Sequence, residues 1–301
     1  MLNCEVLQEQ QCSMRFTFRL FLPLLVSLLL VSSLRSASFS DRYWTTSDGA
    51  RLHYMEAGKG PDSLVFVPGW LMPAAVFEKQ VQELSKEFRV IAFDPRAQGK
   101  SQVHAGPYTP ERRSQDLHEL LREARVDSCI LAGWSLGVME VLDFMARHHP
   151  RNVRGLVLID NSIGEGSPPP AGRSSRAPTQ SREERMRAFT ESLTHKPLDK
   201  KTFSAIYSST LQVPPAVATE LVNKPFPREY WRDTLLAQKL PVLYAIRPRF
   251  AEQGAALRSK RPKSASVEIF EHAGHALFLD EPNRFNELAA AFARRVFHAT
   301  P

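Results

Sequence analysis

The chain has 301 residues, of which 43% are hydrophobic and 24% are charged, and its formal net charge is +7. This composition is typical of a globular protein with a sizeable core, and it excludes a disordered chain. The basic residues are scattered and carry no zinc-finger or RNA-binding signature, so the positive charge does not indicate a nucleic acid as partner.

The first 38 residues have the pattern of a targeting segment. A short basic stretch at 14–19 precedes a charge-free apolar run at 20–34, and small residues follow at 36–38. Because the run is shorter than the roughly 20 residues of a membrane span, we predict a signal peptide and an exported protein, periplasmic or secreted. The alternative is an uncleaved N-terminal anchor, which would make the membrane a partner. Residues 1–13 fit a signal peptide poorly and suggest a misassigned start.

From residue 42 onward, strand-like and helix-like segments alternate. YWTT and RLHYMEAG, joined by a Ser-Asp-Gly turn, predict a hairpin. Continuous apolar runs predict buried strands at SLVFVPG (63–69), RVIAFDP (89–95), CILAGW (129–134) and VRGLVLID (153–160). Apolar residues at helical spacing predict helices over 73–86, 110–125 and 136–147. This order predicts an α/β fold with a mostly parallel, doubly wound sheet.

A long insertion then interrupts the alternation. Its first part, 161–180, is rich in Pro, Gly and Ser and predicts a loop. Its second part, 181–237, predicts helices that are broken at Pro197, Pro214 and Pro227. The alternation resumes with the strand PVLYAIRP (241–248), a helix near 251–260, the strand SVEIFEH (266–272) and a helix over 282–298. We therefore predict a core formed by residues 39–160 and 238–301, with 161–237 as a helical cap after the sixth strand.

The sequence Gly133-Trp134-Ser135-Leu136-Gly137 lies between a predicted strand and a predicted helix. A serine hydroxyl is a poor nucleophile and needs a base to take its proton. A sharp strand-to-helix turn would expose Ser135, and the small residues on either side allow the backbone to make that turn. The N–H groups at the start of the helix would stabilise a developing oxyanion. In this context the pattern predicts a nucleophile.

With these motifs the chain resembles the α/β-hydrolase superfamily from about residue 42 to its end. VFVPGW (65–70) stands where the family has its oxyanion loop, although Pro68 replaces the usual histidine. AFDPRAQGKS (92–101) and EHAGHALFLDEP (271–282) resemble two further family motifs, and the insertion stands where the family has its cap. The resemblance implies a serine hydrolase without metal or organic cofactor, with oxyanion amides from Leu136 and Trp70.

The resemblance also implies His275 as the base, because it follows Gly274 after a strand; His272, expected on that strand, is the alternative. The position of the acid departs from the family pattern. The family places it after the strand PVLYAI, where this chain has Arg247. Asp160, at the end of LVLID, is the best substitute because it keeps the order serine, acid, histidine. Glu252 and a serine–histidine dyad are the other possibilities, and Asp160 as a simple turn cap is the structural explanation.

Several reactive residue types have a structural explanation. Asp94 precedes the nucleophile and is expected to organise its turn with Arg96. Cys129 is expected to be a buried, inert thiol, and no CxxC or His/Cys cluster indicates a metal. Isolated histidines are expected to be ordinary surface or core residues: His53, His104, His118, His148, His149, His195 and His298.

The sequence thus predicts a hydrolase of a carboxylic ester or lactone of a small, partly apolar acid. Residues 170–240 contain 12 Lys and Arg against 7 Asp and Glu, so the substrate could be anionic, or the basic face could simply be solvated. Alternatives are a cofactor-free haloperoxidase or perhydrolase with the same triad, and a hydrolase-like binding protein with slow or no turnover. Ser135 argues against an epoxide hydrolase or a dehalogenase. Neither the exact substrate nor the oligomeric state follows from the sequence.

Overall fold

The computed structural model describes residues 39–166, 180–223 and 225–298. In this part of the chain, eight strands form one sheet with the order β1-β2-β4-β3-β5-β6-β7-β8. The strands are β1 (Ser40–Thr45), β2 (Arg51–Ala57), β3 (Asp62–Val67), β4 (Arg89–Asp94), β5 (Ser128–Trp134), β6 (Val153–Ile159), β7 (Val242–Ile246) and β8 (Ala265–Ile269). Strands β1, β2 and β4 pair antiparallel, and all other neighbours pair parallel. The predicted mostly parallel sheet is confirmed.

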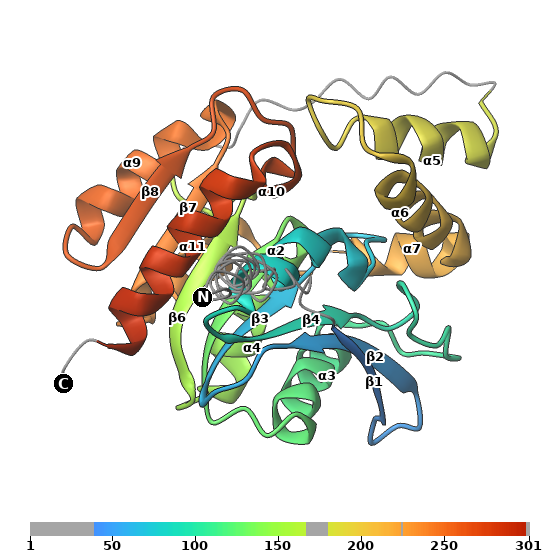
Figure 1. Cartoon of the computed structure of the whole chain (residues 1–301), viewed down its shortest axis with the longest axis horizontal. Helices are drawn as coiled ribbons and strands as arrows, with labels where there is room; N and C mark the ends of the chain where they lie inside the picture. Colours follow the sequence, from blue (N-terminus) through green and yellow to red (C-terminus); the bar gives the residue numbers. More distant parts are fainter. Residues whose placement is uncertain (1–38, 167–179, 224, 299–301) are drawn as a thin grey trace, which may run out of the picture. The chain divides into compact units, whose positions relative to one another are not determined.

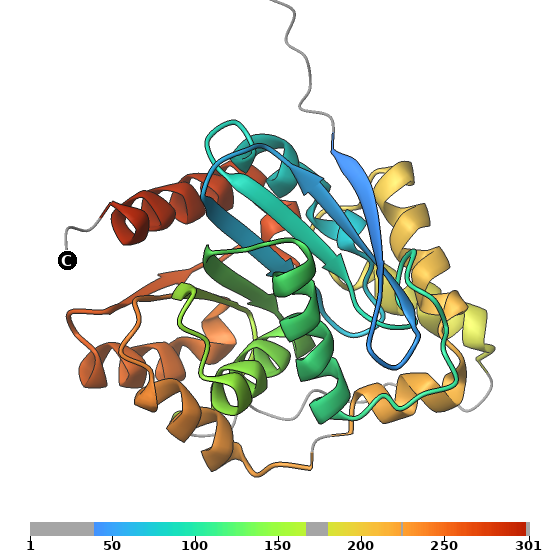
Figure 2. The ribbon, with the colours of Figure 1, turned by 90° about the horizontal axis from the view of Figure 1, so that it is seen from below.

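Helices cover both faces of this sheet, as Figure 2 shows: α2 and α11 lie on one face, and α3, α4 and α9 lie on the other. The helical elements of the core are η1 (Ala74–Phe77), α2 (Glu78–Leu84), α3 (Pro110–Glu123), α4 (Leu136–His148), η2 (Pro248–Phe250), α9 (Ala251–Lys260), α10 (Leu277–Asp280) and α11 (Pro282–Phe297). With both faces covered, the central strand β5 is buried along nearly its whole length. Continuous apolar strands of this kind are what a doubly wound sheet requires.

Four further helices lie between β6 and β7 in the chain, and we call them the helical insertion (Figure 1). They are α5 (Arg182–Glu191), α6 (Lys200–Gln212), α7 (Pro215–Leu221) and α8 (Arg228–Ala237). Ser181 and Glu184 form a capping box at the start of α5, and Asp199 caps α6. Helix α6 packs against η1, and α8 packs against α4. The insertion is therefore anchored to the core at two places.

The ends of two predicted elements differ from the structure. The strand predicted to reach residue 272 ends at Ile269, so His272 lies exposed in a turn. The reason is the neighbouring strand β7, which ends at Ile246, opposite Ile269, and leaves an extension of β8 without a partner. The segment 73–86 divides into a 3₁₀ turn and the helix α2. Apolar spacing does not distinguish these two helix types in so short a segment.

The predicted targeting segment, residues 1–38, lies outside the described residues. Among the helices that the structure does describe, none is both long and apolar enough to cross a membrane.

Candidate active site

Ser135 joins β5 to α4 in a strained turn. Its backbone has φ 54° and ψ −119°, a conformation that residues other than glycine rarely adopt. The turn is possible because Gly133 and Gly137 approach each other, and a Cβ at Gly133 would collide with the carbonyl oxygen of Gly137. Gly137 in turn packs against the carbonyl of Val67 at the end of β3. The two glycines of the motif are thus needed for backbone contact, and Ser135 is half-buried at the start of a helix.

Hydrogen bonds from the next strand hold this turn in place. The amide of Ser135 donates to the carbonyl of Ile159 (3.0 Å), and the side-chain amide of Asn161 donates to the Ser135 carbonyl (2.6 Å). Tyr244 donates its hydroxyl to the carbonyl of Asn161 (2.7 Å). Burial, together with the Asp160 charge, raises the pKa of Tyr244 well above its usual value, so this phenol remains a donor. The strained serine is therefore tied to the turn that carries Asp160.

Asp160, directly after β6, and His275, in the loop after β8, are brought together although they are 115 residues apart in the chain. Nδ1 of His275 lies 2.7 Å from Oδ2 of Asp160. The Asp160 side chain is fully buried, whereas the His275 side chain is 25% exposed. Asp160 also has a positive φ of 45°, which makes it, like Ser135, one of six such non-glycine residues in the described part of the chain. A buried acid that holds a partly exposed imidazole is the arrangement that a general base requires.

Arg247 is the feature that the sequence reasoning missed. It follows β7, where the family usually has its acid, and it binds the substitute acid on the neighbouring strand. Its Nε donates to Oδ2 of Asp160 (2.6 Å), and its backbone amide donates to Oδ1 (2.9 Å). Its Nη2 lies 3.4 Å from Nδ1 of His275. The available signal was the parallel pairing itself, because residues directly after neighbouring strands lie side by side.

The loop that carries His275 is fixed by two contacts. The indole Nε1 of Trp134, the residue before the serine, donates to the carbonyl of His275 (2.9 Å), and the two rings are 5.2 Å apart. The amide of Gly274 donates to Oδ2 of Asp280 (2.8 Å). Asp280 also accepts from the amides of His195 and Lys196 in the helical insertion (2.8 and 2.9 Å). One carboxylate therefore joins the histidine loop to the insertion.

The two predicted oxyanion donors come from two segments that meet at Ser135. Leu136 is the first residue of α4, and Trp70 follows β3 in a loop whose Gly69 packs against the Ser135 side chain. The side chain of Trp70 points to the insertion: its Nε1 donates to the carbonyl of Ala218 (2.8 Å) and its ring meets Phe189 edge-on. The role of the two backbone amides stays a prediction.

Other residues with chemically reactive side chains lie outside the Asp160–His275 pair. Glu252 is exposed in the first turn of α9, close to Gly166, while the His275 ring is held by Asp160. Cys129 is free and buried, and burial raises the pKa of its thiol to about 12. Among the described residues, no group of three or more His, Cys, Asp or Glu side chains could hold a metal ion.

Asp94 is bound by backbone amides and by His53, and the prediction that Arg96 is its partner is wrong. Its carboxylate accepts from the amides of Ala74 and Lys100 and lies 2.6 Å from Nδ1 of His53. Arg96 instead binds Asp116 through Nε (2.5 Å) and Nη2 (2.7 Å). The turn and the adjacent helix α3 therefore use separate acids, a distinction that the spacing Asp-Pro-Arg does not reveal.

Comparison with known proteins agrees with the fold. The model of the alpha/beta hydrolase family matches residues 64–288. The AB hydrolase superfamily protein YisY of Bacillus subtilis is 26% identical, over 83% of this chain and 98% of that protein. The pimeloyl-[acyl-carrier protein] methyl ester esterase of Proteus mirabilis is 26% identical, over 79% of this chain and 94% of that enzyme. The esterase RhEst1 from Rhodococcus superposes with a TM-score of 0.72 at 23% identity, over 85% and 99% of the two chains.

Proposed function

The chain belongs to the alpha/beta hydrolase family, and on that premise we propose that it is a serine esterase whose triad is Ser135, His275 and Asp160. The observation that carries the proposal is the 2.7 Å contact between His275 Nδ1 and the buried Asp160 carboxylate, next to a strained serine turn. The contact orients the imidazole and would stabilise the imidazolium that forms during the reaction.

In the proposed mechanism, His275 Nε2 takes the proton from the Ser135 hydroxyl as its oxygen attacks the ester carbonyl. The amides of Leu136 and Trp70 hold the oxyanion of the tetrahedral intermediate. His275 then protonates the leaving alcohol, and an acyl group remains on Ser135. Water, activated by the same histidine, attacks the acyl group and releases the acid.

The proposed substrate is a small carboxylic ester or lactone with a partly apolar acyl group. Support comes from the esterase names of similar proteins and from the apolar side chains that the insertion places next to the core, such as Phe226 and Trp231. The helical insertion would act as the cap that selects the substrate. An anionic substrate is the variant that the basic residues of the insertion would favour.

Labelling with a fluorophosphonate tests the proposal directly, because the reagent modifies only an activated serine. We expect labelling of the wild-type protein and none of Ser135→Ala, together with turnover of at least one member of a panel of esters and lactones of varied acyl length. Folded wild-type protein that neither reacts with the reagent nor hydrolyses any ester would contradict the proposal. It would instead favour a binding protein.

We also propose that the protein is exported, on the evidence of the apolar run at 20–34 and the small residues after it. Mass spectrometry of the protein recovered from cells that express the full chain tests this. A mature N-terminus near residue 38 in the exported fraction is the expected result, and an intact N-terminus in the membrane fraction would support an anchor instead.

A further inference from the structure

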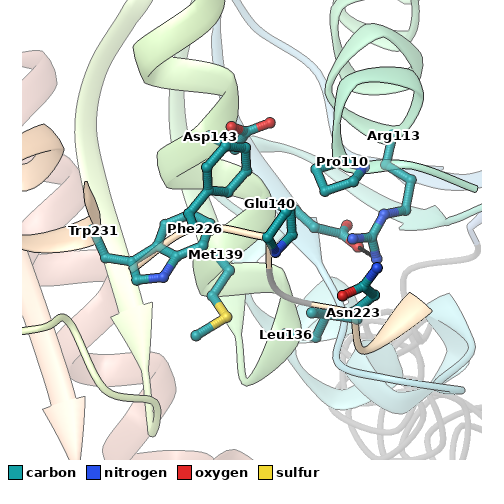
Figure 3. Close-up of a pocket in the computed structure, with 10 residues that line it drawn as sticks. Pro110, Arg113, Leu136, Met139, Glu140, Asp143, Asn223, Phe226 and Trp231 are labelled. Carbon is teal, nitrogen blue, oxygen red and sulfur yellow. Dashed lines mark hydrogen bonds and ion pairs between the residues drawn. The ribbon is translucent and has the colours of Figure 1, made fainter. Parts of the chain in front are cut away.

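Two contacts between the helical insertion and the core differ in chemistry. At α4, Phe226 and Trp231 of the insertion line a narrow pocket together with Met139 (Figure 3). Tyr230 adds a hydrogen bond from its hydroxyl to Oδ1 of Asp143 (2.7 Å). This contact is formed by side chains of both partners. The other contact lies at the loop between β8 and α10, and there the insertion contributes backbone groups.

That second contact reaches both neighbours of His275. The segment 193–196, in the link between α5 and α6, lies beside α10 (Figure 1). The amide of Ala276 donates to the carbonyl of Leu193 (2.7 Å). Gly274 lies so close to the same residue that a Cβ added to it would be 2.7 Å from the Leu193 carbonyl oxygen. The insertion therefore contacts the residue before and the residue after the candidate base.

The carboxylate of Asp280 joins the same two segments. Its Oδ2 accepts from the amides of Gly274 and His195 (both 2.8 Å), and its Oδ1 accepts from the amide of Lys196 (2.9 Å). The residue is 8% exposed and is the last residue of α10. A carboxylate at the C-terminal end of a helix does not stabilise that helix. The role of Asp280 therefore lies in its bonds to the histidine loop and to the insertion.

The position of His275 depends on these bonds because its two ring nitrogens have separate tasks. Nδ1 is held by Asp160 (2.7 Å), and Nε2 has to reach the hydroxyl of Ser135. Hydrogen bonds to an ionised carboxylate are shorter and stronger than those between neutral groups, so Asp280 can fix the loop backbone firmly. Firm placement matters, since a displacement of ~1 Å can cost a catalytic group ~100-fold in rate.

We propose that Asp280 is a positioning residue that holds His275 at Ser135 by fixing the histidine loop to segment 193–196 of the insertion. The inference rests on the proposed esterase function and gives the insertion a part in catalysis besides the selection of substrate. Asp160 orients the imidazole ring, and Asp280 holds the backbone from which that ring extends. Displacement of segment 193–196 therefore lowers turnover even when Ser135 and Asp160 keep their places.

Asp280→Asn tests the proposal, because it keeps the size of the side chain but presents an NH₂ group to amides that need an acceptor. The full chain is assayed on a reactive ester as wild type, Asp280→Asn, Asp280→Glu and Tyr230→Phe. Tyr230→Phe is the matched control, since it removes one insertion–core bond at Asp143 on α4. We expect kcat of Asp280→Asn to fall between about tenfold and about 100-fold, with KM within about twofold of the wild type. Asp280→Glu keeps the charge and should recover part of the loss, and Tyr230→Phe should keep kcat within about twofold.

Proton NMR separates positioning of the histidine from stabilisation of the fold. The proton between His275 Nδ1 and Asp160 should give a low-field resonance in the wild type, and Asp160→Asn assigns it by its loss. In Asp280→Asn, under conditions where circular dichroism shows folded protein, this resonance should broaden or shift. The corresponding proton between His53 and Asp94 is the internal reference and should not change.

The possible failures have different signatures. Wild-type protein that neither reacts with the fluorophosphonate nor hydrolyses any ester contradicts the esterase function, and the inference is then wrong as well. An active wild type whose Asp280→Asn variant keeps kcat, or loses activity through KM alone, overturns only the inference. If Asp280→Asn does not fold, the exposed residue His195 offers a second test. His195→Pro removes one amide donor to Asp280 and should have a kcat at least about threefold below that of His195→Ala, which keeps the amide. Equal kcat values in these two variants would also overturn the inference.

Discussion

Two regions of this molecule contain a histidine held by a buried aspartate, and the hydrogen bonds are nearly the same. Nδ1 of His275 lies 2.7 Å from Asp160, and Nδ1 of His53 lies 2.6 Å from Asp94. The pairs differ at the other ring nitrogen. Nε2 of His53 lies 2.9 Å from Asp41, and the ring is 1% exposed. His275 is 25% exposed, and within the described residues its ring has hydrogen-bond partners only at Nδ1.

The comparison teaches that an aspartate–histidine pair is not in itself catalytic. A general base needs one nitrogen that is oriented and one that is accessible to the proton it accepts. His53 has both nitrogens bound to acids, Asp94 on β4 and Asp41 on β1, so it fixes β2 to both of its neighbouring strands. His275 has one nitrogen fixed and lies on a loop against Trp134, next to the serine. The first pair serves the fold, and the second is available for chemistry.

The largest predicted effect comes from Asp160→Asn. The substitution preserves size but removes the charge that orients His275 and stabilises its protonated form, so kcat for a reactive ester should fall by ~10⁴-fold. Circular dichroism and thermal melting should show a folded protein, because Arg247, which loses its counter-ion, is partly exposed. Steady-state kinetics on purified protein measures the loss.

Wild-type turnover in this variant would remove Asp160 from the triad. Glu252→Gln, at the other acid that the sequence offers as a candidate, is then the informative variant. A tenfold loss in Glu252→Gln together with an active Asp160→Asn would contradict the comparison between the two pairs.

Asp94→Asn is the matched substitution in the other pair, and it should affect stability instead. Asp94 accepts from two backbone amides and faces His53, and an asparagine NH₂ cannot accept these bonds. Removing one partner of such a buried network should lower the free energy of unfolding by about 3 kcal/mol. Urea denaturation measures this. The folded fraction should keep kcat within about tenfold, and a loss comparable to that of Asp160→Asn would show that both pairs take part in catalysis.

Most of the fold could be predicted from the sequence because its signals are local. Continuous apolar runs identify the buried strands, and apolar residues at helical spacing identify the helices. The ends of the strands were less predictable. The length of an edge strand such as β8 depends on where its neighbouring strand ends. The short helix α10 gave no periodic signal over four residues.

The candidate site residues that a motif or the chain order identifies were predictable. The residues that act through long-range contacts were less predictable. Ser135, Asp160 and His275 follow from motif and chain order, and the structure places the last two in contact. Arg247 was noticed only as a missing acid, because its partner lies on a neighbouring strand 87 residues away. Asn161 and Asp280, which fix the serine turn and the histidine loop, use long-range bonds to backbone groups that no residue pattern encodes.

Glu140 is a third buried acid, and it accepts fewer hydrogen bonds than Asp94 or Asp160. Burial raises the pKa of Glu140 from 4.5 to about 7, and Arg113 only partly offsets this. The folded state therefore binds a proton that the unfolded state has released between these pH values, so the free energy of unfolding falls as pH rises from about 4.5 to 7.

Glu140→Gln removes this titration. The free energy of unfolding of the variant, minus that of the wild type, should increase from pH 4 to pH 8 by an amount on the order of 2–3 kcal/mol. Urea denaturation of both proteins across that range measures the difference. A difference that does not change with pH would mean that Glu140 is ionised throughout, in contrast to the prediction from its burial.

The smallest effect is expected for Arg247→Met, which tests how firmly the proposed catalytic pair must be held. The variant loses the side-chain bond to Asp160, while the backbone amide of residue 247 still donates to Oδ1. A hydrogen bond between charged groups contributes about 1.5–3 kcal/mol, and part of this is regained from solvent at a side chain that is 24% exposed. We expect kcat to fall by about tenfold with KM nearly unchanged, because the bond orients Asp160 rather than the substrate. Arg247→Lys, which keeps a cation near Asp160, should recover part of the loss. An unchanged kcat in both variants would mean that the backbone amide and His275 alone position Asp160, so that the proposed catalytic pair needs no cation beside it.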